Sequence, residues 1–342
     1  MTKDQISRSQ KILVVDDEPM NLAALKQILG DDYQLVYARS GTEALAATSI
    51  HTFSLILLDI QMPDMDGFEV CKRLKADQST EAIPVIFVTS LADCGDEAAG
   101  FAVGAVDYII KPISPTVVHA RVRTHLSLIR ATLLEQSHRE AIYMLGDAGH
   151  YNDNDTGVHI WRMASYSACF ASKIGWSPEH CLQIELSAAM HDTGKIGILN
   201  AILRKPGKLD SAEWEIMKTH SRVGYEILSK SRAPVFTLAA EIALYHHERY
   251  DGSGYPCGLV GDEIPESARI IAVCDVFDAL TMKRPYKDAW PLERALVTIR
   301  EDSGSHFDPQ LVDIFMSILP EILVIKKHWD AKEVAHATSL TF

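Results

Sequence analysis

The chain has 342 residues, of which 47% are hydrophobic and 23% charged, and its formal net charge is −13. This length is typical of two domains, each large enough to bury a core of its own. The negative charge excludes a protein whose overall field attracts nucleic acid, so an anionic ligand must be held by locally placed cations. No apolar run reaches the length of a membrane span, and the six cysteines show no C-x-x-C spacing. We therefore expect reduced thiols in a cytoplasmic protein that binds neither nucleic acid nor membrane.

Four short apolar runs in the first third of the chain predict buried parallel strands. They are KILVV, LILLD, PVIFVTS and DYIIKP, at residues 11–15, 55–59, 84–90 and 107–112. Helical patterns lie between them, such as PMNLAALKQILG, with a proline near its start and a glycine at its end. This alternation predicts an α/β fold, a doubly wound parallel sheet that binds ligands at the carboxyl ends of its strands.

Polar side chains collect at the ends of these predicted strands. Exposure to water explains any one of them, but five at one sheet edge indicate a site. Three are carboxylates, which repel one another unless a divalent cation or a lysine neutralises them. The five residues are Asp16, Asp17, Asp59, Thr89 and Lys111.

The motifs VVDDEP, LLDIQMPDMDGFE and YIIKP carry a family resemblance: residues 11–128 resemble a response-regulator receiver domain, which has a five-stranded parallel sheet. The resemblance implies that Asp59 accepts a phosphoryl group from a sensor histidine kinase. It also implies a Mg²⁺ site made of three acidic side chains and one backbone carbonyl. These ligands are Asp16, Asp17, Asp59 and the carbonyl of Gln61.

The same resemblance implies a response to phosphorylation. Thr89 and Lys111 would contact the phosphoryl group, and Lys111 would precede a cis-proline at Pro112. Tyr108 is then the switch aromatic whose rotamer changes together with Thr89, although local sequence alone describes an ordinary edge aromatic. An aspartyl phosphate adds charge and acceptor oxygens, so the contacting side chains must move to meet it.

A helical connector comes after the first domain. After Pro115 neither glycine nor proline interrupts the chain until about Leu145, and apolar residues recur at steps of three and four. Two interpretations stay open: a last helix that packs only on its own sheet, or a longer rod that dimerises or transmits a signal. The segment GDAGHYNDNDTG marks a break. We expect a receiver domain at 1–128, a helical linker at 129–149, a second domain at 150–325 and a tail at 326–342.

The second half predicts helices that carry histidines and acids inside their apolar stripes. Neighbouring His246 and His247 point about 100° apart on a helix, so one apolar face cannot hide both. Asp275 interrupts the apolar run ARIIAVCDVFDAL, where an unpaired carboxylate is costly. A lone histidine of this kind is usually a hydrogen-bonded core residue, but a set of them with acids favours a transition metal. The set is His159, His191, Asp192, His220, His246, His247 and Asp275.

Residues 150–325 also resemble a known family, the HD-GYP domain, an all-α phosphodiesterase branch of the HD superfamily. The motifs are HDTGKIGI, MKTHSRVGYEIL, HHERYDGSGYP and IPESARIIAVCDVFDALTMKRPYK. The resemblance implies that the seven residues above bind two metals, with Asp192 as the bridge. Fe or Mn are the expected ions, and Ni or Zn the alternatives. Some members hold a third metal through a glutamate whose place is taken here by Asp155, so three ions are the alternative to two.

A pair of metals suits phosphodiester hydrolysis, because the ions lower the pKa of a bridging water and clamp phosphate oxygens. Lys195 lies three residues after Asp192 and can stabilise the nucleophile or the phosphate, unless it is a solvated lysine at a helix end. Glycines in the loop DGSGYP permit close backbone approach to a ligand, and arginine suits bidentate phosphate contact. The expected substrate-binding residues are Gly254, Tyr255, Pro256, Arg284 and Lys287. The alternatives are that the loop is a tight turn without a ligand and that Arg284 and Lys287 are ordinary surface charges.

The sequence therefore predicts a response regulator in which phosphorylation of Asp59 controls hydrolysis of cyclic di-GMP to pGpG, and whether pGpG or GMP is the end product stays open. The guanine specificity comes from the resemblance alone. Alternatives are a sensor or scaffold without turnover, and an HD phosphohydrolase acting on cyclic GMP–AMP or a nucleoside triphosphate. The expected partners are the kinase, cyclic di-GMP, GGDEF-domain proteins and a second copy in a homodimer.

Overall fold

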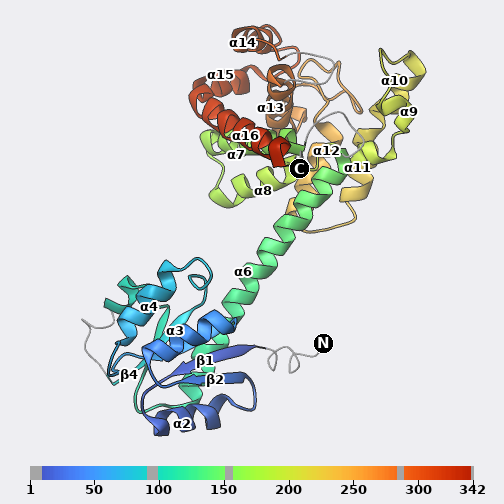
Figure 1. Ribbon diagram of the computed structural model, residues 1–342. Coiled ribbons are helices and arrows are strands. Elements are labelled where there is room, and N and C mark those ends of the chain that lie inside the picture. The colour runs from blue at the N-terminus through green and yellow to red at the C-terminus, as the bar shows by residue number, and fades with distance from the viewer. Residues whose placement is uncertain (1–9, 91–98, 151–156, 283–288, 340–342) are drawn as a thin grey trace. The chain divides into compact units, whose positions relative to one another are not determined.

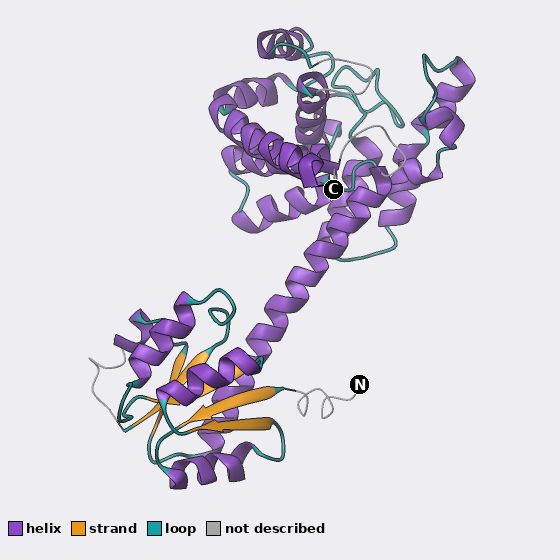
Figure 2. Cartoon of the chain, viewed as in Figure 1, coloured by secondary structure: helices purple, strands orange, loops and turns teal. Residues whose placement is uncertain are grey.

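The computed structural model describes residues 10–90, 99–150, 157–282 and 289–339, which fall into two compact units, 1–135 and 136–342 (Figure 1). All strands of the described sheet belong to the first unit, and the second unit is built from helices and loops (Figure 2). The predicted fold class, an α/β domain followed by an all-α domain, is confirmed. Among the described residues no helix has both the length and the apolar character needed to cross a bilayer.

The first unit contains a five-stranded sheet in the order β2-β1-β3-β4-β5, and every neighbouring pair is parallel. The central strands are buried on both faces, which explains their unbroken apolar sequences. The edge strand β2, of sequence QLVYA, is half exposed and shows no such run. The strands are β1 (Lys11–Val15), β2 (Gln34–Ala38), β3 (Leu55–Asp59), β4 (Val85–Thr89) and β5 (Asp107–Ile110).

Helices cover both faces of this sheet. On one face, α2 (Pro19–Leu29) and the start of α6 (Pro115–His150) contribute Leu25 and Val122 to an apolar cluster with β1, β3 and β4. On the other face, α3 (Gly41–Ile50) and α4 (Gly67–Ala76) pack against Leu13 and Leu58. Because all strands run in parallel, Asp16, Asp59, Thr89 and Lys111 lie at the same carboxyl edge.

The helix α6 belongs to both units. Val118, Val122 and Leu126 are buried in the core of the first unit, while Ile142 is buried in a cluster of the second unit that includes Met190. Residues 130–138 are exposed. The helix therefore packs on its own sheet, as one interpretation of the sequence held, and also continues well beyond it, as the other held.

The second unit is a helical bundle. Its largest core joins α7, α13 and α15 through aromatic contacts of Tyr166, Phe170, Phe277 and Phe315. The helices are α7 (Gly157–Ile174), α8 (Pro178–Ala188), α9 (Asn200–Leu203), α10 (Ser211–Lys218), α11 (His220–Leu228), α12 (Pro234–Tyr245), α13 (Glu266–Thr281), α14 (Leu292–Glu301), α15 (Pro309–Ser317) and α16 (Leu319–Ser339). Two 3₁₀ helices, η1 (Thr193–Gly197) and η2 (Gly261–Glu263), complete it.

The start of α15 is fixed by its local sequence. Asp308 caps the helix and accepts a hydrogen bond from the backbone N–H of Gln310, and Pro309 takes the first helical position. At the C-terminal end, residues 326–339, which the sequence analysis leaves as a tail, continue α16.

Candidate metal centre and phosphorylation site

Three carboxylates meet at the carboxyl edge of the sheet in the first unit. Asp16 and Asp17 come directly after β1 and Asp59 ends β3, and one oxygen of each lies within 4.8 Å of the others. The Lys111 ammonium donates to Asp16 Oδ2 at 2.9 Å and to Asp59 Oδ2 at 2.7 Å. Asp16 and Asp59 are only 1% and 4% exposed, so their charges need these partners. Such an all-oxygen group suits Mg²⁺, and Gln61 lies beside it, with its backbone N–H 3.3 Å from Asp59 Oδ1.

The charges of this cluster shift its pKa values. Burial raises the pKa of the Asp59 carboxyl, and the hydrogen bond and charge of Lys111 offset only part of that rise. Burial acts to lower the pKa of Lys111, but the two carboxylates outweigh it and raise that pKa above its usual value. Lys111 therefore keeps its positive charge beside the carboxylate of Asp59.

Thr89 and Tyr108 lie beside this cluster on neighbouring strands. Both are buried. The centroid of the Tyr108 ring lies 5.6 Å from that of Phe87 and 5.3 Å from that of Phe101. A Cβ at Gly100 would overlap the Tyr108 hydroxyl, so glycine provides the space for this inward position. The Lys111–Pro112 peptide bond is cis, as expected.

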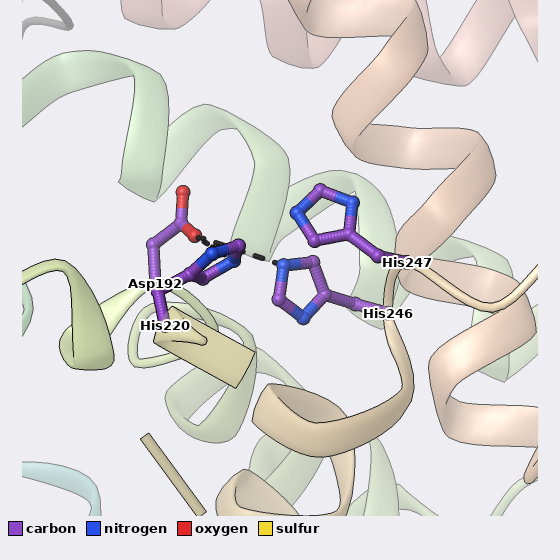
Figure 3. A group of neighbouring side chains, drawn as sticks. All are labelled: Asp192, His220, His246 and His247. Carbon is purple, nitrogen blue, oxygen red and sulfur yellow. Dashed lines mark ion pairs between the residues drawn. The ribbon is translucent and has the colours of Figure 1, made fainter. Parts of the chain in front are cut away.

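The second unit brings together, from three elements, a first group of side chains that could hold a metal ion (Figure 3). Asp192 precedes η1, His220 begins α11, and His246 and His247 come directly after α12; one ligand atom of each lies within 4.8 Å of the others. The ring nitrogens Nε2 of His220 and His246 lie 3.3 and 3.6 Å from Asp192 Oδ1. Sequence analysis predicted all four.

A second group, also predicted, adjoins the first. His159 on α7, His191 and Asp275 on α13 offer ligand atoms within 4.8 Å of one another, with His159 Nε2 3.5 Å from Asp275 Oδ1. The Nε2 atom of His191 lies 3.2 Å from Asp192 Oδ2. The two oxygens of Asp192 thus face different groups, which is the geometry expected of a carboxylate between two ions.

Hydrogen bonds fix how three of these histidines present their nitrogens. Their Nδ1 atoms face backbone carbonyl oxygens, which only accept, so Nδ1 carries the hydrogen and Nε2 presents a lone pair. The Nε2 atoms of His220 and His246 are buried and make no hydrogen bond among the described residues. Lone pairs that face a carboxylate oxygen repel it unless a cation lies between them, so these residues fit divalent metals. The Nδ1 contacts are His191 with Ala188 at 2.9 Å, His220 with Met217 at 2.7 Å and His246 with Ile242 at 3.0 Å.

The pKa shifts agree with this fit. Burial lowers the pKa of His220 to about 4, and burial together with the neighbouring imidazoles lowers the pKa of His247 well below its usual range. Both rings are therefore neutral ligands at pH 7. Burial opposes protonation of His159, but Asp275 and Asp278 outweigh it and raise its pKa to about 10. The protonated ring faces Asp278 with Nδ1 and Asp275 with Nε2, and a metal that binds Nε2 would displace the proton from that nitrogen.

Close backbone packing positions His191 and Asp192 against α11. A Cβ at Gly194 would overlap the carbonyl oxygen of His220, so only glycine lets η1 approach this closely. Lys195 on η1 places its ammonium 2.7 Å from Asp192 Oδ2. The positive charge predicted for the site is therefore present at the carboxylate shared by both groups.

The loop at residues 251–260, called here the GYP loop, lies against the first group. Its Tyr255 ring stacks on His247 at 4.8 Å between centroids, and a Cβ at Gly254 would overlap the backbone of Glu248. Glu248 is 2% exposed, and its carboxylate accepts hydrogen bonds from the N–H groups of Cys257, Gly258 and Leu259. Glu248 is not among the residues predicted from the sequence, although an acid that directly follows two histidines and precedes a glycine-rich loop is a usable signal.

Two further residues were missed. Asp278 and Arg162 lie buried behind His159; the signal for Asp278 is its place one helical turn after Asp275, inside an apolar run. Three predicted residues, Asp155, Arg284 and Lys287, lie outside the described part of the chain.

The receiver and hydrolase sites define a response regulator with a metal-dependent hydrolase domain, and comparisons with known proteins agree. The response regulator receiver domain family matches residues 12–123, and the HD domain family matches residues 132–311. The chain belongs to the family of response regulators that join these two domains.

Named relatives support the same assignment. The chain is 38% identical to a "probable cyclic di-GMP phosphodiesterase" of Vibrio cholerae, over 89% of this chain and 77% of the relative. It is 39% identical to the "cyclic di-GMP phosphodiesterase response regulator RpfG" of Xanthomonas campestris, over 89% of this chain and 86% of the relative. Over 56% of this chain and 37% of the relative, it is 42% identical to "3'3'-cGAMP-specific phosphodiesterase 2" of Vibrio cholerae.

Proposed function

We propose that this protein hydrolyses cyclic di-GMP at a binuclear metal centre, and that phosphorylation of Asp59 controls the reaction. The observation that carries the proposal is the pair of adjoining ligand groups that share Asp192, with buried imidazole nitrogens facing its oxygens. The two relatives that align over most of the chain carry the name cyclic di-GMP phosphodiesterase.

The ligand groups assign a role to each side chain. His159, His191 and Asp275 would hold one ion, and His220, His246 and His247 the other, with Asp192 between them. Bound divalent ions, with Fe or Mn expected and Ni or Zn as alternatives, supply an activated water and neutralise charge on the phosphate. In the alternative with three ions, Asp155 would hold the third.

The side chains around the ligand groups bind and orient the substrate. The Lys195 ammonium, held beside Asp192, offers a cation to a phosphate oxygen. The GYP loop brings Gly254, Tyr255 and Pro256 next to His247, where they would line the substrate. Arg284 and Lys287 would hold a phosphate. Opening the ring gives pGpG, and a second cleavage gives GMP.

Control begins at the receiver site. A sensor histidine kinase would phosphorylate Asp59, with Mg²⁺ held by Asp16, Asp17, Asp59 and the Gln61 carbonyl. Lys111 and Thr89 would then contact the phosphoryl group and Tyr108 would change rotamer. The helix α6, which continues from the receiver core into the second unit, is the covalent route for the signal.

The experiment is a product assay on protein purified without oxygen and loaded with Fe²⁺ or Mn²⁺. We expect wild-type protein to convert cyclic di-GMP to pGpG, His220→Ala to lose metal and turnover together, and Asp59→Asn to respond no longer to beryllofluoride, an aspartyl-phosphate mimic. Tight binding of the dinucleotide by fully loaded protein without product would instead favour a sensor or scaffold.

A second substrate is favoured by one observation, the 42% identity to a 3'3'-cGAMP-specific phosphodiesterase. Cyclic GMP–AMP and cyclic di-GMP, offered together to the same metal-loaded sample, compete for one centre. The ratio of their kcat/KM values decides between them, and a ratio in favour of cyclic GMP–AMP overturns the assignment to cyclic di-GMP.

A further inference from the structure

A buried carboxylate lies directly behind the candidate metal centre. Asp278 on α13 is fully buried, and its Oδ2 lies 2.6 Å from Nδ1 of His159. Arg162 on α7 donates to the same carboxylate from two nitrogens, Nε at 2.5 Å and Nη2 at 2.8 Å. Asp278 thus accepts from the ring nitrogen of His159 that points away from Asp275.

His159 differs in this contact from the histidines whose Nδ1 atoms donate to backbone carbonyl oxygens. The Nδ1 atoms of His191, His220 and His246 face carbonyl oxygens of their own chain segments, within four residues. The ring orientation of His159 instead depends on a side chain 119 residues away. A carboxylate partner of this kind fixes the ring, selects the tautomer and makes the imidazole a stronger ligand.

Arg162 extends the contact towards the surface. Its Nη1 donates to Asp330 Oδ1 on α16 at 2.7 Å, and Lys326 on the same helix donates to Asp330 Oδ2 at 2.9 Å. Asp330 is 44% exposed, whereas the Arg162 side chain is 1% exposed. Trp329 adds a hydrogen bond from its indole N–H to Ser165 of α7, at 3.1 Å. The ion pairs therefore run from solvent, through α7, to a metal-site histidine.

We propose that α16 is a functional part of the metal centre, because Asp330 and Arg162 hold Asp278 and Asp278 positions His159 for metal binding. These three are positioning residues and touch neither metal nor substrate. The HD family match ends at residue 311, so α16 lies beyond it. The inference rests on the metal centre of the proposed function and is independent of which dinucleotide is cleaved.

Titration of the metal-free full-length chain with Mn²⁺ tests the inference without any substrate. We expect two Mn²⁺ sites in the second unit of the wild-type protein. The acidic group of the receiver can take up a further Mn²⁺ ion, and none of the variants below touches that group. Asp278→Asn keeps the shape but removes the charge, and should weaken one site only, by about 10- to 100-fold. Asp330→Asn should weaken the same site by about twofold to fivefold, the weight of a half-exposed ion pair. Glu321→Gln changes an exposed acid of the same helix and should leave both affinities unchanged.

A reciprocal measurement separates positioning from ordinary structural support. If α16 and His159 are coupled, Mn²⁺ must stabilise α16 by the same factor by which docked α16 stabilises Mn²⁺ binding. Hydrogen exchange of the α16 amides should therefore slow on adding Mn²⁺ to wild-type protein and to Glu321→Gln, and respond less in Asp330→Asn. If Asp278→Asn fails to fold, Asp330→Asn alone decides.

Two results overturn the inference. One is an unchanged Mn²⁺ affinity in both Asp278→Asn and Asp330→Asn. The other is a rate of hydrogen exchange in α16 that does not change when Mn²⁺ is added to the wild-type protein. Wild-type protein whose second unit binds no Mn²⁺, so that His220→Ala leaves the titration unchanged, overturns it together with the metal centre. If Mn²⁺ binds and couples to α16 but cyclic di-GMP is not cleaved, the inference stands and the proposed substrate fails.

Discussion

Replacing Glu248 with glutamine tests how the GYP loop is held against the metal centre. The two carboxylate oxygens of this buried side chain accept from three consecutive backbone N–H groups. Oε1 lies 2.7 Å from Cys257 N and 3.2 Å from Gly258 N, and Oε2 lies 3.0 Å from Gly258 N and 3.1 Å from Leu259 N. Glutamine has the same shape and retains one acceptor oxygen, but it carries no charge.

The contacts set the size of the effect. The glutamine oxygen can still serve Cys257 and Gly258, but its NH₂ group then faces the N–H of Leu259, a donor against a donor. The remaining hydrogen bonds lose their charge and one buried donor is left unsatisfied. Together these changes lower the free energy needed to open the loop by about 2–4 kcal/mol. At about 1.4 kcal/mol for each factor of ten, the loop amides should exchange about 30- to 1,000-fold faster.

Hydrogen exchange at residues 257–259 measures this directly, because these amides are the donors themselves. The matched control is Glu263→Gln, which removes the charge from an exposed acceptor of Val260 N and should change stability by about 0.5 kcal/mol or less. We expect Mn²⁺ binding by Glu248→Gln to persist while kcat/KM falls, since Tyr255 loses its fixed place on His247. Unchanged exchange at these amides in a folded variant would refute the reasoning.

Two further substitutions test packing and charge. Gly194→Ala puts a Cβ onto the carbonyl oxygen of His220, a backbone atom that cannot move aside as a side chain can. Denaturant unfolding should show that the free energy of unfolding falls by about 1–3 kcal/mol, and Mn²⁺ should bind more weakly. Gly197→Ala is the control, because its Cβ meets only side-chain atoms of Val223, and it should lose less stability. Burial and Arg249 lower the pKa of His306 to about 4 from 6.5, so the unfolded chain takes up this proton first and stability falls as pH drops from about 6.5 to about 4, by at most about 3 kcal/mol. That part of the acid loss should be absent in His306→Gln, and an identical pH profile of the free energy of unfolding in both proteins would contradict the assignment.

The elements that sequence could predict share a local physical cause. Both faces of β3 and β4 are buried, so their sequences are unbroken apolar runs that end in the site residues Asp59 and Thr89. The edge strand β2 has one half-exposed side and its pattern, QLVYA, gives no comparable run. Only the resemblance to a receiver domain implied the fifth strand.

The candidate metal ligands were predictable for the opposite reason. A histidine or aspartate inside an apolar stripe is a polar group in an apolar environment and needs a partner. Seven such residues indicate a common partner, such as a metal centre. Glu248 and Asp278 satisfy their charges through partners that no local period encodes: three backbone N–H groups in one case, and Arg162, 116 residues away, in the other. Features that depend on long-range pairing needed the structure.

The two sites balance their charge differently, and this difference bears on how one can regulate the other. In the receiver, Lys111 already joins Asp16 and Asp59, so the cluster is neutralised in part before any metal binds. In the proposed function, a phosphoryl group on Asp59 would take Lys111 from those bonds, and the lysine would then be a two-position element that phosphorylation biases. In the second unit, Lys195 lies at Oδ2 of Asp192, while the ring nitrogens of His220 and His246 face Oδ1. If the proposed metals occupy this centre, they supply the cation that Oδ1 and these ring nitrogens share, and phosphorylation of Asp59 would then act on access or geometry around bound ions.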